Sequence, residues 1–202
     1  MPVWAARFGL ADSRKLFRMN SLEFIKRAGK GKPQPVYVLH GDEHFLKRQV
    51  LAVLRAWVLG PEDQGFGTAN HPGDKAAWAA VRDELETLPF LSPRRLVVVD
   101  NADPFVSRER ARLEKYVAQP AATGVLVLDV QTWLPQTKLA KLLPDGGLIV
   151  CKTPAAQSLP GWCMEWCLAH HGKALAAPAA RHLVDLVGAD MGLLDQEMAK
   201  LA

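Results

Sequence analysis

The sequence has few cysteines and no long apolar run. Its three cysteines are Cys151, Cys163 and Cys167. They are few and odd in number, so they do not make a disulfide framework, and a reducing cytoplasm is the simplest location. No apolar run approaches the ~20 residues that a membrane-spanning helix requires, so no membrane contact is expected. The remaining composition, 49% hydrophobic and 23% charged, is that of a globular protein with a packed core.

Positive charge is concentrated towards the N-terminus. Residues 1–55 contain 11 Lys and Arg against 4 Asp and Glu, a net charge of +7, whereas the remaining residues contain 14 against 17, a net charge of −3. A basic region of this kind can bind a polyanion such as DNA, contact an acidic partner, or simply be a solvated surface. The charge alone leaves these alternatives open.

Short apolar segments alternate with helical patterns over most of the chain. The five predicted strands, of which the second is the weakest, cover residues 36–40, 65–70, 95–100, 125–130 and 148–152. One helix is predicted before the first strand, at residues 21–28, and four between the strands, at residues 44–59, 74–88, 107–117 and 136–143. Apolar strands joined by helices are typical of a parallel sheet covered on both faces. The sequence therefore predicts an α/β domain over residues 19–153.

The two ends of the chain differ from this pattern. Beyond residue 153 no strand is predicted, and three helices at residues 159–171, 178–187 and 190–201 indicate a small helical domain over residues 154–202. Residues 1–18 look detached and lack the continuous apolar core of a secretory signal. We expect them to be a flexible extension; a transit peptide, or an over-long start with the true start at Met19, are the alternatives.

The segment after the first apolar strand has the layout of a phosphate-binding loop, but two of its residues are missing. A working loop reads G-x-x-x-x-G-K-[ST]: its glycines let backbone N–H groups surround the phosphates, and its hydroxyl binds Mg²⁺. Here Gly41 and Lys47 are kept, but Leu46 stands at the second glycine and Arg48 at the hydroxyl. Two acidic residues also follow Gly41, where an anion would bind. The loop is therefore predicted not to bind ATP, and no cofactor or metal is expected.

The strand over residues 95–100 supports the same prediction. In ATPases of this architecture an apolar strand ends in Asp-Glu, one residue for Mg²⁺ and one to polarise water. Here it ends in Asp100-Asn101, and a carboxamide cannot take a proton from water. No catalytic residue is predicted, and Asp100 could simply begin a turn.

Seven segments occur in a characteristic order along the chain: YVLHGDEHFLKRQV, LETLPFLSPRRLVVVDNAD, LEKYVAQPAATGVLVLDV, KLAKLL, IVCKTP, LPGWCMEWCLAHHGKAL and VGADMGLLDQEMAKL. Their order and spacing resemble the delta subunit of the bacterial DNA polymerase III clamp loader, over roughly residues 19–202. The resemblance implies an AAA+-like domain with a degenerate phosphate loop, followed by a helical lid domain. The family also carries a third, helical collar domain, which does not follow here, so we expect a fragment or a truncated gene product.

The resemblance also implies a function and partners. Delta subunits bind the sliding clamp (beta) and open its ring for loading onto primed DNA during replication, while other loader subunits hydrolyse ATP. The implied partners are therefore the clamp, the gamma/tau and delta prime subunits, and primed DNA in the assembled loader. The complex as a whole is a DNA-directed DNA polymerase, a nucleotidyltransferase, but this chain would be a non-catalytic subunit of it.

In the family, a hydrophobic pair at the end of the helix before the central strand grips the clamp. The matching residues are Phe90 and Leu91, in reversed order, with Leu88 and Pro89 before them. Two large apolar side chains at a helix end suit insertion into a partner's pocket. The alternative is that one or both belong to this protein's own core.

Two further patterns carry weaker alternatives. Cys163, Cys167 and His170 or His171 lie on one predicted helical face, a spacing that could hold Zn²⁺ with one more ligand or could simply place small residues in the core. Arginines at residues 94–95 and 107–112 could contact DNA phosphates or form a solvated surface.

Overall fold

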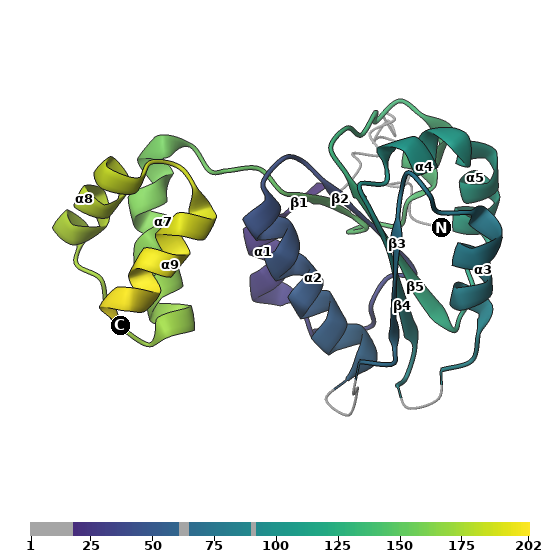
Figure 1. The fold of residues 1–202 in the computed structure, drawn as a ribbon, viewed down its shortest axis with the longest axis horizontal. Coiled ribbons are helices and arrows are strands. Elements are labelled where there is room, and N and C mark those ends of the chain that lie inside the picture. The colour runs from purple at the N-terminus through teal and green to yellow at the C-terminus, as the bar shows by residue number, and fades with distance from the viewer. Residues whose placement is uncertain (1–17, 61–64, 90–91) are drawn as a thin grey trace, which may run out of the picture.

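A computed structural model describes residues 18–60, 65–89 and 92–202, and it contains a parallel β-sheet with helices on both faces (Figure 1). The strands lie in the order β1-β6-β2-β5-β4-β3, and every pairing between them is parallel. Their bounds are Arg18–Asn20 (β1), Val36–His40 (β2), Thr68–Pro72 (β3), Arg95–Asp100 (β4), Gly124–Val130 (β5) and Leu148–Val150 (β6). The predicted α/β class is confirmed.

Within the described residues the sheet has six strands, one more than the five predicted. The additional strand, β1, lies at the edge of the sheet and pairs only with β6, with Met19 opposite Ile149. It is three residues long and reads Arg-Met-Asn, so it has neither the length nor the apolar pattern that marks a buried strand. The other residues of the predicted N-terminal extension lie outside the described part of the chain.

The strands β2, β4, β5 and β6 supply apolar residues to both faces of the sheet, because successive side chains point in opposite directions. In β2, Val36 and Val38 face one apolar cluster, whereas Tyr37 and Leu39 face the other. All four are buried, which explains why the strand shows no polar alternation.

Among the described residues of the α/β part, six helices follow the strands. They are α1 (Ser21–Arg27), α2 (His44–Leu59), α3 (Trp78–Glu86), α4 (Asp103–Arg108), α5 (Arg110–Ala118) and α6 (Lys138–Leu142). Figure 1 shows α1 and α2 on one side of the sheet and α3, α4 and α5 on the other. The single helix predicted over residues 107–117 is wrong: Ser107 lies inside α4, and Glu109 separates α4 from α5.

The C-terminal residues form the predicted set of helices. They are α7 (Leu159–Trp166), which continues into a π-helical turn (Cys167–His171), α8 (Ala177–Val187) and α9 (Met191–Leu201). These helices contact the α/β part through aromatic rings, because the Phe45 ring centroid lies 6.0 Å from that of Trp162 and 5.3 Å from that of Trp166. Within the described ranges, no helix combines the length and apolar character needed to cross a membrane.

Candidate functional site

The degenerate phosphate loop keeps its turn because the backbone requires it. Gly41 has a φ of 136°, and a Cβ at this position would overlap the carbonyl oxygen of Cys151. The amide of Glu43 donates to that same carbonyl oxygen at 3.2 Å. Gly41 is therefore explained by the close approach of two backbone segments, without any ligand.

A carboxylate of the protein lies at the N-terminus of α2, where a nucleotide-binding loop holds a phosphate. One oxygen of Glu43 accepts a hydrogen bond from the backbone N–H of Phe45 at 3.0 Å, and the other accepts one from the hydroxyl of Thr153 at 2.7 Å. Helix N-termini favour negative charge, and this carboxylate supplies it. A phosphate would have to displace Glu43 or lie against it.

Lys47, the remaining basic residue of the loop, is bound inside the protein. Its side chain is 3% exposed, and its Nζ lies 2.5 Å from Oδ1 of Asp129 on β5 and donates to the backbone carbonyl of Val130 at 3.1 Å. Leu46 beside it is fully buried, whereas Arg48 is exposed. The arrangement leaves no uncompensated lysine charge for a phosphate.

Asp100 lies at the C-terminal end of β4, at the same end of the parallel sheet as the phosphate loop that follows β2. Burial raises the pKa of its carboxyl above the ordinary range; the negative charge of Asp129 raises this pKa further, and Arg55 opposes both effects. Asn101 follows with a φ of 49°, in the left-handed region that asparagine tolerates. Asp100 thus ends a strand and begins a tight turn, which agrees with the structural alternative given for it in the sequence analysis.

The loop between α3 and β4 holds the predicted clamp-binding residues. Leu88 is 77% exposed, and Pro89 is half-buried. Phe90 and Leu91 lie outside the described residues. A large apolar side chain left this exposed two residues beyond a helix end is a candidate contact for another protein.

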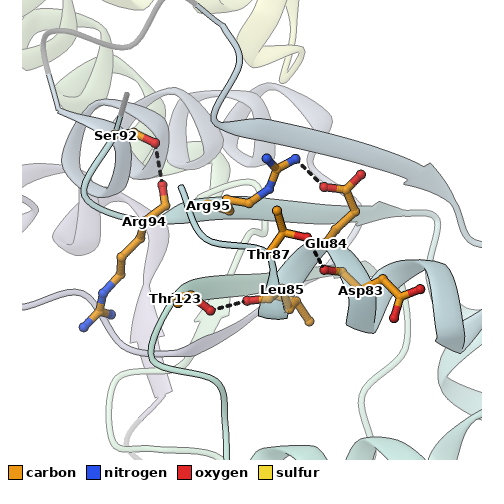
Figure 2. A network of polar contacts seen from close by, with 8 residues as sticks. All are labelled: Asp83, Glu84, Leu85, Thr87, Ser92, Arg94, Arg95 and Thr123. Atoms are coloured by element: carbon orange, nitrogen blue, oxygen red, sulfur yellow. Dashed lines mark hydrogen bonds and ion pairs between the residues drawn. The ribbon is translucent and has the colours of Figure 1, made fainter. Parts of the chain in front are cut away.

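Polar contacts hold both ends of this loop (Figure 2). On the α3 side, the hydroxyl of Thr87 donates to the carbonyl of Asp83 at 2.6 Å. On the β4 side, the hydroxyl of Ser92 donates to the carbonyl of Arg94 at 2.8 Å. An ion pair between Arg95 and Glu84 joins the two sides directly.

The last turn of α3 is also joined to the neighbouring strand. Thr123 donates its hydroxyl to the carbonyl of Leu85 at 2.7 Å, and a Cβ on Gly124 would lie 2.9 Å from the Leu85 Cα (Figure 2). Further along the loop, Arg94 donates to the carbonyl of Pro33 at 3.4 Å. The described residues on either side of Phe90 and Leu91 are thus fixed to the sheet.

Sequence reasoning missed most of the residues that build these two sites. Asp129 has a visible signal, since it is an aspartate within an otherwise apolar strand. Glu84 and Thr123 have none, because the partner of each lies across the fold. The sequence suggests Arg95 as a contact for DNA phosphates, but its guanidinium is paired with Glu84.

The residues of the possible zinc site have other contacts. Cys163 and Cys167 are buried in an apolar cluster, and burial raises the pKa of the Cys163 thiol to about 11. His170 stacks on Trp166 at 3.6 Å between ring centroids, and Nε2 of His171 lies 2.9 Å from Oδ1 of Asp195. These contacts give each residue a structural role in the helical part of the chain.

The arginines of residues 107–112 surround a buried acid. Oε2 of Glu109 lies 2.9 Å from Nη1 of Arg112, and Oε1 lies 3.6 Å from Nε of Arg108. Arg108 also donates to the carbonyl of Ala76 at 2.6 Å. These contacts link α4 and α5 to each other and to the loop after β3, so they support a structural role more than a nucleic-acid surface.

The parallel sheet, the phosphate-loop layout and the helices that follow define an α/β protein in which the protein's own side chains, Glu43 and Lys47, fill the loop that contacts phosphate in nucleotide-binding proteins. Residues 37–151, more than half of the chain, match the family model for the DNA polymerase III delta subunit. The chain belongs to this family.

Individual relatives agree with the family. The chain is 28% identical over 188 residues to DNA polymerase III subunit delta of Bacillus subtilis strain 168, covering 87% of this chain and 54% of the relative. The solved structure of the Bacillus subtilis DNA clamp loader delta protein matches with a TM-score of 0.72 at 27% identity, over 90% of this chain and 56% of that one.

A Thermotoga maritima DNA polymerase III gamma subunit-related protein matches with a TM-score of 0.56 at 17% identity, over 90% of this chain and 58% of that one. This identity supports likeness of fold alone. The chain spans about half the length of the relatives it matches.

Proposed function

We propose that this chain is the clamp-binding part of a clamp-loader delta subunit. It binds the sliding clamp through the loop between α3 and β4, and in the assembled loader it helps to open the ring on primed DNA without hydrolysing ATP itself. Residues 19–153 form the AAA+-like domain and residues 154–202 the lid. The gamma/tau and delta prime subunits are its partners in the loader, in the cytoplasm.

The exposure of Leu88 on a loop fixed at both ends is the observation that carries this proposal. Binding a partner costs less when the residues that flank the contact are already held in place, because fewer side chains and backbone torsions are immobilised. Phe90 and Leu91 continue the same loop, so the proposal assigns them the central contact.

The contacts of the phosphate loop support the non-catalytic half of the proposal. The Glu43 carboxylate and the Lys47–Asp129 ion pair occupy the positions from which a nucleotide loop would contact phosphate. Titration calorimetry with ATP and Mg²⁺ tests this half separately. We expect no binding in the micromolar range, and saturable micromolar binding would contradict it.

Affinity for the purified clamp tests the protein-binding half. The double variant Phe90→Ala/Leu91→Ala should weaken Kd by about 30-fold or more, the scale of a central apolar contact. Leu168→Ala is the matched control, because this leucine is also exposed but lies in the π-helical turn of the helical domain. If the double variant bound as tightly as the unaltered chain, these two residues would not be the contact.

A further inference from the structure

Phe66 is a large apolar side chain that the described part of the protein leaves in solvent. It is 69% exposed and lies in the turn that leads into β3. Within the described ranges it is the only aromatic residue among the exposed large apolar side chains; the others are leucines. Single exposed leucines are common on protein surfaces, whereas a largely exposed phenylalanine exposes a larger apolar area.

The backbone places Phe66 next to the loop between α3 and β4. The carbonyl of Gly67 accepts a hydrogen bond from the amide of Leu96 at 2.8 Å, and Thr68 pairs with Leu96 in the sheet. The turn before β3 is therefore hydrogen-bonded to the strand residue that directly follows Arg95. The chain segments entering β3 and β4 lie at the same end of the sheet (Figure 1).

The same strand, β4, connects the turn that contains Phe66 to the helix that precedes Leu88. Arg95 lies in β4 between the turn before β3 and the start of β5, and its ion pair with Glu84 fixes β4 to α3. Gly65 adopts a φ of 93°, which gives the turn before Phe66 a conformation that a residue with a side chain rarely adopts. Phe66 and Leu88, both exposed, thus lie on neighbouring chain segments at the N-terminal end of the parallel sheet.

We infer that Phe66 is a second apolar contact residue for the protein that the α3–β4 loop binds. This inference rests on the proposed function, so the occupant is the sliding clamp, and the chemistry required is an apolar surface on the clamp beside the pocket that receives the loop. Continuity along the N-terminal end of the parallel sheet favours this occupant. Among the other exposed large apolar residues of the described ranges, Leu134 follows the C-terminal end of β5, at the opposite end of the sheet. The rest, Leu168, Leu186, Leu193 and Leu201, lie on the helical domain.

Clamp affinity of single variants tests the inference. Phe66→Ala should weaken Kd for the purified clamp by about 5- to 30-fold, since an aromatic contact at the side of an interface contributes less than its centre. Phe66→Leu should retain most of the affinity, because a large apolar side chain remains. Leu186→Ala, which removes a 72% exposed leucine from α8, should change Kd less than about twofold.

The results separate failure of this inference from failure of the proposed function. If Phe66→Ala binds like the unaltered chain while Phe90→Ala/Leu91→Ala loses affinity, the inference is wrong and the proposed function stands. If the unaltered chain does not bind the clamp, both fail. Sedimentation velocity tests the alternative occupant: a dimer of the chain that Phe66→Ala dissociates would assign Phe66 to self-association and overturn the inference. An unchanged Tm of Phe66→Ala shows that its loss of affinity does not come from unfolding.

Discussion

At the scale of single residues, the phosphate loop differs from a nucleotide-binding loop in where its charges lie. Glu43 presents a carboxylate to the first turn of α2, and Lys47 turns into the protein to meet Asp129. Both residues are compatible with the loop's backbone, so the turn is kept while its charged side chains bind to the protein itself. A fold alone therefore does not establish whether a protein uses ATP; the side chains of the site decide it.

The Lys47–Asp129 pair gives a prediction for stability. Lys47→Met should lower the free energy of unfolding by about 3–5 kcal/mol, because Asp129 would remain largely buried without its cation. Adding Asp129→Leu should recover much of this loss, since no unpaired charge would remain. Urea unfolding followed by circular dichroism measures both changes.

The control for this prediction is Lys138→Met. The Nζ of Lys138 lies 3.5 Å from Oε2 of Glu114, but the lysine side chain is 74% exposed. Exposed ion pairs of this kind contribute at most about 1 kcal/mol to the free energy of unfolding. If Lys47→Met were no less stable than Lys138→Met, the internal ion pair would have no structural role.

Asp100 gives a prediction for pH dependence. Burial, reinforced by Asp129, raises the pKa of its carboxyl, so the folded state disfavours the ionised form. The stability that this group contributes is therefore complete below its unfolded pKa of about 3.9 and is lost as pH rises through the higher folded pKa. Asp100→Asn should then have a higher Tm than the unaltered chain at pH 7, and the difference should disappear below about pH 4. Thermal unfolding from pH 3.5 to 7 measures this difference, and a lower Tm at pH 7 would contradict the prediction.

At the scale of elements, the sequence pattern predicts what is long and buried. The helix over residues 44–59 has the predicted bounds, because its apolar residues recur at helical spacing and Gly60 ends it. The strand β1 and the break between α4 and α5 were not predicted: the first is a short edge strand, and the second depends on Glu109 binding arginines on both sides. Short elements are decided by tertiary contacts more than by periodicity.

The candidate site was predictable in the same uneven way. The prediction that the loop binds no ATP rests on Leu46 and Arg48, which a sequence displays directly. The bracing of the α3–β4 loop depends on Glu84 meeting Arg95 across eleven residues, and on Thr123 meeting Leu85 across thirty-eight. No local pattern encodes these pairings, since they exist only once the sheet has formed.

The Glu84–Arg95 ion pair gives a prediction at this scale. Arg95→Met and Glu84→Met should each weaken clamp binding by about 2- to 10-fold, because the two flanks of the loop would no longer be joined and would have to be fixed on binding. The exchange Glu84→Arg/Arg95→Glu should restore part of the affinity, since it rebuilds the pair with reversed charges. Calorimetry with the purified clamp measures each Kd.

A neighbouring ion pair on the same helix is the control for the brace. Arg82 lies 2.7 Å from Glu86 on the exposed face of α3, so Arg82→Met should leave Kd unchanged. Equal losses in the single variants and the exchange would indicate that Arg95 acts by touching the clamp itself and not by positioning the loop.

At the scale of the whole molecule, one apolar cluster joins the sheet to the C-terminal helices. It contains residues of β2 and α2 together with residues of α7, α8 and α9. Phe45, in the first turn of α2, lies between the two parts, with edge-on contacts to Trp162 and Trp166. The ion pair between Lys26 and Glu165, 2.6 Å apart, adds an exposed link between α1 and α7.

Because Phe45 is buried at this junction, its removal should affect the two parts together. Phe45→Ala should lower the free energy of unfolding by about 3–5 kcal/mol, the range for deleting a buried phenylalanine. It should also speed hydrogen exchange throughout α7–α9, since these helices would lose the aromatic contact that holds them to α2.

Phe105→Ala is the matched control: it removes a fully buried phenylalanine from the opposite face of the sheet, where the cluster contains no residue of α7–α9. Phe105→Ala should lower the free energy of unfolding by a similar amount. Hydrogen exchange in α7–α9 should then rise only as far as the lower global stability requires. Equal exchange in the two variants would mean that the helical part is held to the sheet by contacts other than Phe45.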